Sequence, residues 1–295
     1  MSANDSLAYY TRPGPLTAAG GHQASLETLP GDVPALFEAV PGLLIHEFLP
    51  GLYGLDREPG YTETGHLRST EHILGRLLAD GRPLAERREP ADRLGGSCRH
   101  FTLITVAALR AHGIPARARC GFGTYFQPGW HVDHWVAEYW NAAEGRWILG
   151  DAQMDPILVE SLNLDFDPVD IPRDKFVVAG QAWESFRAGE LDPDRCGLAD
   201  TDDEFGWWWI AGNLIRDTAA LANMELLPWD VWGAMPEPSP IDGAPLDLFD
   251  RLASLTADPD TAADVRELYE AEDGIRVPDQ VFNFIRKSAE PVLAT

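Results

Sequence analysis

The stretch from Ser97 to Gly150 constrains the fold most, because one helix pattern is followed by three strand patterns with turn signals between them. Ser97 is a suitable N-cap and Gly113 a suitable C-terminal cap for a helix over 97–112. The strand patterns cover 116–125, 133–140 and 146–150, separated by Pro128-Gly129 and by the turn residues 141–145. A helix followed by antiparallel strands predicts an α+β core.

The chain of 295 residues is long enough to bury a sizeable core with segments on either side of it. Before the core, residues 1–69 form an N-terminal lead-in with helical pieces. The core itself is expected over 70–156, beginning with an amphipathic helix near 70–79. After it, residues 157–295 are expected to form a mainly helical C-terminal extension packed on the core.

The charge and the cysteine count exclude several classes of protein. With 23 basic and 47 acidic residues, the net charge of −24 disfavours nucleic-acid binding. The sequence contains no apolar run of about 18 residues, so it predicts no membrane span. Residues 1–20 lack the pattern of a signal peptide, so we expect a cytoplasmic protein. The 3 cysteines form no disulfide framework and no CxxC zinc motif.

Three residues of this stretch suggest nucleophilic chemistry. Cys98 opens the predicted helix, where the helix dipole and unpaired backbone N–H groups favour thiolate over thiol. His134 and Asp151 come later, at the edges of two predicted strands, and a hairpin can place both on one face. An imidazole beside the thiol would act as the base, and a carboxylate would orient the imidazole.

Alternatives at the same positions stay open. His131 is a second possible base, and His131 with His134 and Asp133 or Asp151 is a possible metal site. Strand alternation disfavours the metal site, because positions 131 and 133 lie on one face and 134 on the other. We therefore expect no metal and no other cofactor.

Other side chains near these positions are candidates for secondary roles. Arg99 and His100 follow the cysteine and either contact a substrate or tie the helix start to neighbouring loops. We place them with the candidate substrate-binding residues His131, Asp133 and Trp135. Glu138 is expected to be a structural partner, and Cys120 a core residue. The run Trp207–Trp209 is expected in the core; the alternative is that one ring covers the Cys98 cleft.

Three segments in order resemble the bacterial transglutaminase-like family. G-S-C-R-H-F-T-L-I-T-V-A-A-L-R-A-H-G-I-P-A-R, beginning at Gly96, is similar to the family signature G-x-C-R-D-F-A followed by G-I-P-A-R. H-W-V-A-E-Y-W and R-W-I-L-G-D-A resemble the family's histidine and aspartate segments. The resemblance covers roughly residues 70–156. It implies a papain-like fold and a triad of Cys98, His134 and Asp151. His100 replaces the signature's aspartate, and Gln153 stands where the family has threonine.

The function that follows is acyl transfer or hydrolysis of an amide or ester through a thioester on Cys98. The expected partner is a small-molecule or peptide acyl substrate, with no nucleic acid and no membrane. Resolution by water is slightly favoured over resolution by an amine, which would make the chain an amide-forming acyltransferase. A non-catalytic binding module of the same fold is the alternative from another class. The sequence assigns neither the substrate nor the oligomeric state.

Overall fold

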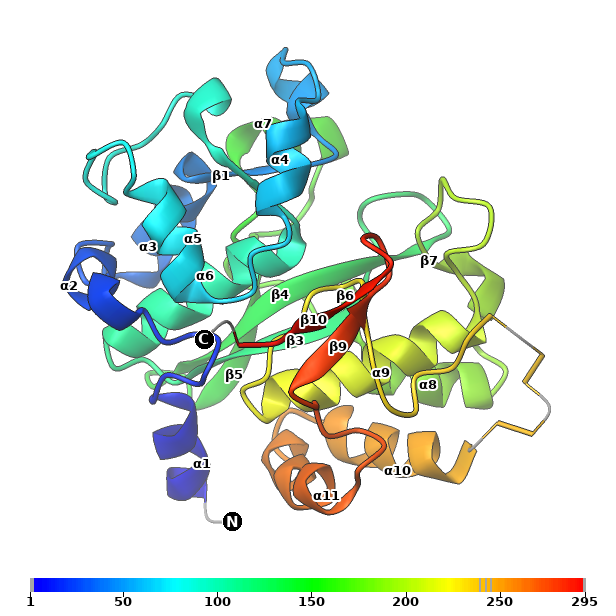
Figure 1. Cartoon of the computed structure of the whole chain (residues 1–295). Coiled ribbons are helices and arrows are strands. Elements are labelled where there is room, and N and C mark those ends of the chain that lie inside the picture. The colour runs from blue at the N-terminus through cyan, green and yellow to red at the C-terminus, as the bar shows by residue number, and fades with distance from the viewer. Residues whose placement is uncertain (1–2, 239, 242, 245, 294–295) are drawn as a thin grey trace. The chain divides into compact units, whose positions relative to one another are not determined.

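The computed structural model describes residues 3–238, 240–241, 243–244 and 246–293 (Figure 1). Its elements divide into two compact units that are interleaved along the chain. The N-terminal unit comprises residues up to 118 together with 136–171. The C-terminal unit comprises 119–135 and the residues from 172 on. The sequence analysis predicted three consecutive segments, 1–69, 70–156 and 157–295, and residues 1–2, 239, 242, 245 and 294–295 of these lie outside the described residues.

The N-terminal unit is mostly helical, with α6 at its centre. Every residue of α6 from Cys98 to Arg110 is buried, and α3 and α5 pack against it (Figure 1). Ser97 takes extended backbone angles just before the helix, and Gly113 takes a φ of +76° just after it, as the cap signals predict. The helices of this unit are α1 (Ala3–Tyr10), α2 (Gln23–Leu26), α3 (Val33–Ala39), α4 (Pro59–Thr64), α5 (Thr70–Leu77), α6 (Cys98–Ala111) and α7 (Pro156–Leu162).

A short parallel strand pair leads into α6. β1 (Leu44–His46) pairs with β2 (Leu94–Gly96) in register, with His46 opposite Gly96. The backbone N–H of Glu47 donates to the carbonyl of Gly96 at 2.9 Å, which extends the pairing toward Cys98. The sequence patterns did not predict either strand.

The hairpin after α6 confirms the predicted strand order in this unit. β4 (His131–Asn141) pairs antiparallel with β5 (Arg146–Gly150), with Ala137 opposite Gly150 and Asn141 opposite Arg146. Glu138 lies on β4 and accepts a hydrogen bond from Arg117 Nε at 2.8 Å, and both side chains are fully buried. Glu138 is therefore the structural partner that the sequence suggested.

The C-terminal unit combines sheet strands with a group of packed helices. In the sheet, β3 (Ala116–Gly123) lies between β4 and β6 (Phe176–Val178), and β7 (Cys196–Gly197) pairs parallel with β4. This unit holds residues 119–123 of β3 and residues 131–135 of β4. Among its helices, α8 and α9 pack together and α10 packs on both. The helices are α8 (Ala179–Arg187), α9 (Trp207–Leu221), α10 (Leu246–Thr256) and α11 (Val265–Ala271).

A buried ion pair ties β3 to α9. Arg119 Nη2 lies 2.9 Å from Asp217 Oδ2, and both side chains are fully buried. Asp217 Oδ1 also accepts the backbone N–H of Cys120 at 2.8 Å. Because both charges are compensated and hydrogen-bonded, the pair fixes the position of the helix against the strand.

The C-terminal segment ends in strands that the sequence did not predict. β9 (Gln280–Asn283) and β10 (Ser288–Pro291) form an antiparallel hairpin (Figure 1). β8 (Asp230–Val231) pairs with β9. The remainder of this segment is mainly helical, as expected. Helices and antiparallel strands together confirm the α+β class.

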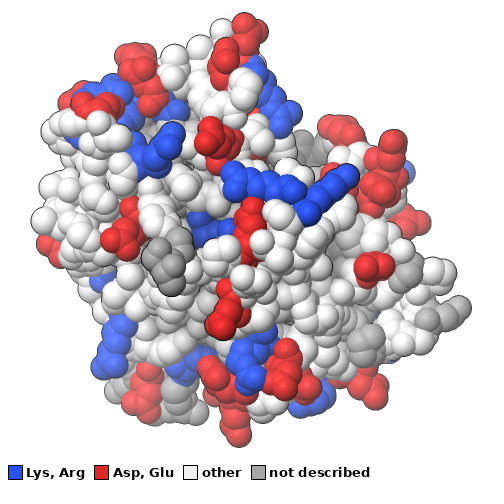
Figure 2. Space-filling model, viewed as in Figure 1, with Lys and Arg blue, Asp and Glu red and all other residues white. Residues whose placement is uncertain are grey.

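The surface carries the charge imbalance in scattered groups. In the view of Figure 2, red acidic groups are spread over the face and interspersed with blue basic ones. On this face of the molecule the distribution is typical of a solvated surface. Within the described part of the chain, none of the helices has the length and apolar character needed to cross a bilayer.

Candidate active site

Cys98 is the first residue of α6, in the N-terminal unit. Its side chain is 8 % exposed, and the residues that follow it in the helix are buried. A thiol at the start of a 14-residue helix faces the positive end of the helix dipole and the first backbone N–H groups. Backbone N–H groups at such a helix start can donate to an oxyanion that develops beside the sulfur.

His100 holds the start of α6 in place. The backbone N–H of Ser97 donates to His100 Nδ1 at 3.1 Å, so the ring nitrogen acts as an acceptor. Burial, and then the positive charge of Arg99, lower the pKa of His100 well below its ordinary value. The imidazole is therefore neutral, and its position fits the second of the two predicted roles, which was fixing the helix start.

Arg99 has a similar structural position. Its side chain is fully buried, and Nη2 donates to the carbonyl of Arg68 at 2.6 Å. Nη1 donates to the carbonyl of Leu67 at 3.4 Å. These bonds connect the first turn of α6 to the chain that follows α4.

Asp151 directly follows β5 in the N-terminal unit. Its backbone N–H donates to the carbonyl of Pro168 at 2.8 Å, and its Oδ1 accepts the backbone N–H of Gln153 at 3.0 Å. The residue is 2 % exposed. The strand end and the following turn therefore fix the direction of this carboxylate.

His134 lies on β4 in the C-terminal unit and is 3 % exposed. Its ring contacts three aromatic rings of the same unit. The Phe126 centroid lies 4.7 Å away, that of Tyr125 6.2 Å and that of Phe176 6.4 Å. Tyr125 and Phe126 belong to the connection between β3 and β4. The sequence analysis did not identify them, although two adjacent aromatics before the Pro128-Gly129 turn were a visible signal.

The candidate Asp133 binds α9. It accepts hydrogen bonds from Trp209 Nε1 at 3.0 Å and from Asn213 Nδ2 at 3.1 Å. Burial raises its pKa, and the positive charge of Arg216 opposes this effect. With both oxygens engaged by one helix, Asp133 has the contacts of a structural anchor.

His131 and Trp135, the two other candidates on β4, are on the same face of the strand as Asp133. Trp135 is 1 % exposed, and its Nε1 has no hydrogen-bond partner among the described residues. His131 is half-buried beside β7, opposite Cys196, and burial lowers its pKa. Residues 131, 133 and 135 thus alternate with His134 along the strand, as the sequence predicted.

The tryptophan run differs from its prediction. Trp207, Trp208 and Trp209 were expected in the core, but all three are half-buried. They occupy the first turn of α9, where successive residues point about 100° apart, so one face of the turn meets solvent.

Among the residues that the structure describes, no group of three or more His, Cys, Asp or Glu side chains could hold a metal ion.

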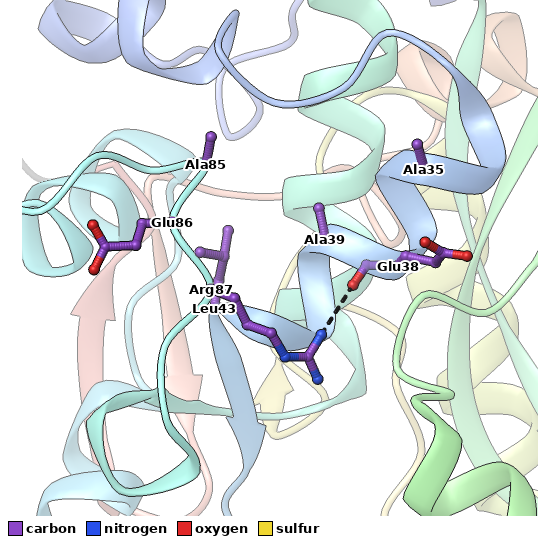
Figure 3. Close-up of a pocket in the computed structure, with 7 residues that line it drawn as sticks. All are labelled: Ala35, Glu38, Ala39, Leu43, Ala85, Glu86 and Arg87. Atoms are coloured by element: carbon purple, nitrogen blue, oxygen red, sulfur yellow. Dashed lines mark hydrogen bonds between the residues drawn. The ribbon is translucent and has the colours of Figure 1, made fainter.

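A hollow in the N-terminal unit lies between α3 and the segment before β2, where Arg87 Nη1 donates to the carbonyl of Glu38 at 3.5 Å (Figure 3). Its lining residues are Ala35, Glu38, Ala39, Leu43, Ala85, Glu86 and Arg87, none of which is a predicted site residue.

Comparison with known proteins identifies one segment of the chain. Residues 82–152 match the family model of the transglutaminase-like superfamily. We call these residues the transglutaminase-like core, after the family model that they match. The match supports a cysteine-enzyme family. Cys98, His134 and Asp151 all fall within the transglutaminase-like core.

The other comparisons add less. The chain is similar to a crystal structure named "a Putative Cysteine Protease from Cytophaga hutchinsonii", with 17% identity and a TM-score of 0.37. The similarity covers 60% of this chain and 46% of that chain, so less than half of the other protein's length is spanned. No curated protein matches the sequence.

Proposed function

We propose that this protein is a cysteine-dependent acyl-transfer enzyme. The observation that carries the proposal is Cys98 at the first position of the buried helix α6, inside the matched residues 82–152. In the proposed triad, Cys98 is the nucleophile, His134 the general base and Asp151 the group that orients the imidazole.

The β4–β5 hairpin supports the proposed pairing of His134 with Asp151. His134 lies on β4, and Asp151 directly follows Gly150, the last residue of the antiparallel partner strand β5.

The proposed reaction has two steps. The Cys98 thiolate attacks the carbonyl carbon of an amide or ester, and the carbon–nitrogen or carbon–oxygen bond breaks. The leaving amine or alcohol takes the proton that His134 removed from the thiol, and a thioester remains on sulfur. His134 then removes a proton from the incoming molecule, which attacks the thioester and restores the thiol. The backbone N–H of Cys98 is a candidate donor to the oxyanion.

We favour water as the incoming molecule, since it is always present and no amine site was recognised in the sequence. The products are then a carboxylic acid and the free thiol. The acyl donor is proposed to be a small molecule or a peptide, in a cytoplasmic protein that uses no cofactor for this chemistry.

Intact mass spectrometry with a panel of p-nitrophenyl esters, amides and acyl thioesters tests the proposal. We expect one acyl adduct on Cys98, and a loss of turnover of at least about a thousandfold in Cys98→Ala. The free energy of unfolding should change by only about 1 kcal/mol, because the removed sulfur is small.

Cys196→Ala is the matched control. Cys196 is fully buried, and burial raises the pKa of its thiol to about 12, so its removal should alter neither the adduct nor the rate. Full activity in Cys98→Ala would contradict the proposed role of Cys98. No adduct on Cys98 and no turnover with any donor would contradict the proposed function and would favour a non-catalytic module.

A further inference from the structure

The connection between β3 and β4 places two half-buried aromatic rings beside His134. The Phe126 ring is inclined by 64° to the imidazole, and the Tyr125 ring by 87°. The two rings also contact each other, with centroids 4.5 Å apart. All of these residues belong to the C-terminal unit.

These rings differ from the third aromatic neighbour of His134. Phe176 of β6 is fully buried and forms part of the core. Tyr125 and Phe126 lie in the connection between two strands and keep part of their surface in solvent. Large aromatic side chains left partly exposed next to a reactive group are typical of ligand pockets.

The backbone is shaped to hold the Phe126 ring at this place. A Cβ atom on Gly123, the last residue of β3, would overlap the rings of Phe126 and Tyr125. Glycine at this position therefore allows the connection to fold back, so that both rings lie against the end of the strand and the imidazole. The aromatic pair is thus built into the strand end.

We propose that Tyr125 and Phe126 form the subsite for the acyl group of the substrate, an inference that rests on the proposed function. The acyl group is a neutral aromatic group or a bulky apolar group. The general base must lie within hydrogen-bonding reach of the nucleophile, so groups that flank the imidazole also flank the reacting carbonyl. An aromatic acyl group can pack edge-to-face on these rings, as the imidazole does. The net charge of −24 disfavours an anionic acyl group.

A series of p-nitrophenyl esters tests this subsite, because the leaving group stays constant while the acyl group changes. We expect kcat/KM of the full chain to be at least about tenfold higher for the 3-phenylpropionate than for the acetate, after correction for the uncatalysed rates. In Phe126→Ala this ratio should fall by about tenfold, and in Phe126→Leu by less. Phe186→Leu is the matched control, since Phe186 is half-buried in the same unit and contacts the Trp183 ring.

The outcomes separate this inference from the proposed function. If Cys98 is acylated by every ester without preference, or if Phe126→Ala keeps the wild-type ratio, the subsite is refuted and the function stands. If kcat/KM of Phe126→Ala falls by the same factor for all esters, the subsite is refuted too, because the ring then only positions the imidazole. If no ester acylates Cys98, the subsite is refuted, and the proposed function is refuted as well if the amides and acyl thioesters also leave no adduct. Thermal midpoints of both Phe126 variants check that the loss of preference is not a loss of folding.

Discussion

Glu47 makes the stability of the N-terminal unit dependent on pH. The residue follows β1 and is 2 % exposed. Its carboxylate faces Gly65, where a Cβ would lie 3.1 Å from Oε1, and this oxygen has no hydrogen-bond partner among the described residues. Burial raises the pKa of Glu47 from 4.5 to about 7, and the positive charge of Arg57 only partly opposes this.

The direction of the effect follows from the raised pKa. Below the unfolded pKa of 4.5 the carboxyl is protonated in both states, so burial of its charge costs nothing. As the pH rises from 4.5 to about 7, the unfolded chain loses this proton while the folded chain keeps it, and the free energy of unfolding falls. Above that range the full cost is present. A pKa difference of about 2.5 corresponds to about 3 kcal/mol.

Glu47→Gln removes this titration. A buried amide carries its own desolvation cost, which does not vary with pH, so the effect of the titration appears only in how the difference between variant and wild type changes with pH. Relative to the wild type, the free energy of unfolding of Glu47→Gln should rise by about 3 kcal/mol between about pH 4.5 and about pH 8. Urea unfolding followed by tryptophan fluorescence at several pH values measures it.

Glu63→Gln provides the control, because Glu63 is exposed on the neighbouring helix α4 and its charge stays in water. Its difference from the wild type should vary little with pH. The reasoning about Glu47 fails if Glu47→Gln and the wild type keep a constant difference over the whole range.

Two further substitutions test the site and the fold. In Asp151→Asn we expect folding to be kept and kcat to fall by about a thousandfold or more, because an amide does not hold the imidazole in the required tautomer. Esterase kinetics with thermal unfolding measure this, and near-normal kcat would remove Asp151 from the proposed triad. In Asp217→Asn the buried Arg119 loses its counter-charge, so the free energy of unfolding should fall by about 3 kcal/mol. Urea unfolding checks it, and a loss below about 1 kcal/mol would show that the pair is not needed.

The core around α6 was predictable because its signals are local. Ser97, Gly113 and the turn residues 141–145 each act within a few positions of the chain, and the structure has a boundary at each of them. The place of Cys98 at the helix start depends on the same signals, and so could be read from the sequence.

Elements formed by distant partners were not predictable. β1 and β2 have three residues each, too few to show a period, and each exists because the other lies beside it. In β9, Val281 is buried while the larger Phe282 is exposed, so the apolar pattern did not indicate which face is inside. The bonds from Trp209 and Asn213 to Asp133 join positions about eighty residues apart, which no local pattern reveals.

The interleaving of the two units determines how the molecule can be dissected. The chain changes unit within β3, again within β4 and once more at residue 172. A fragment ending at residue 118 would lack β5 and α7, and a fragment starting at residue 172 would lack the strands that its helices cover. Neither half of the gene encodes a complete module, so swapping or truncating either end exposes surface that is normally inside. Insertions at exposed turns such as residues 142–145, between β4 and β5, preserve both units and are the safer route to tagging or tethering this protein.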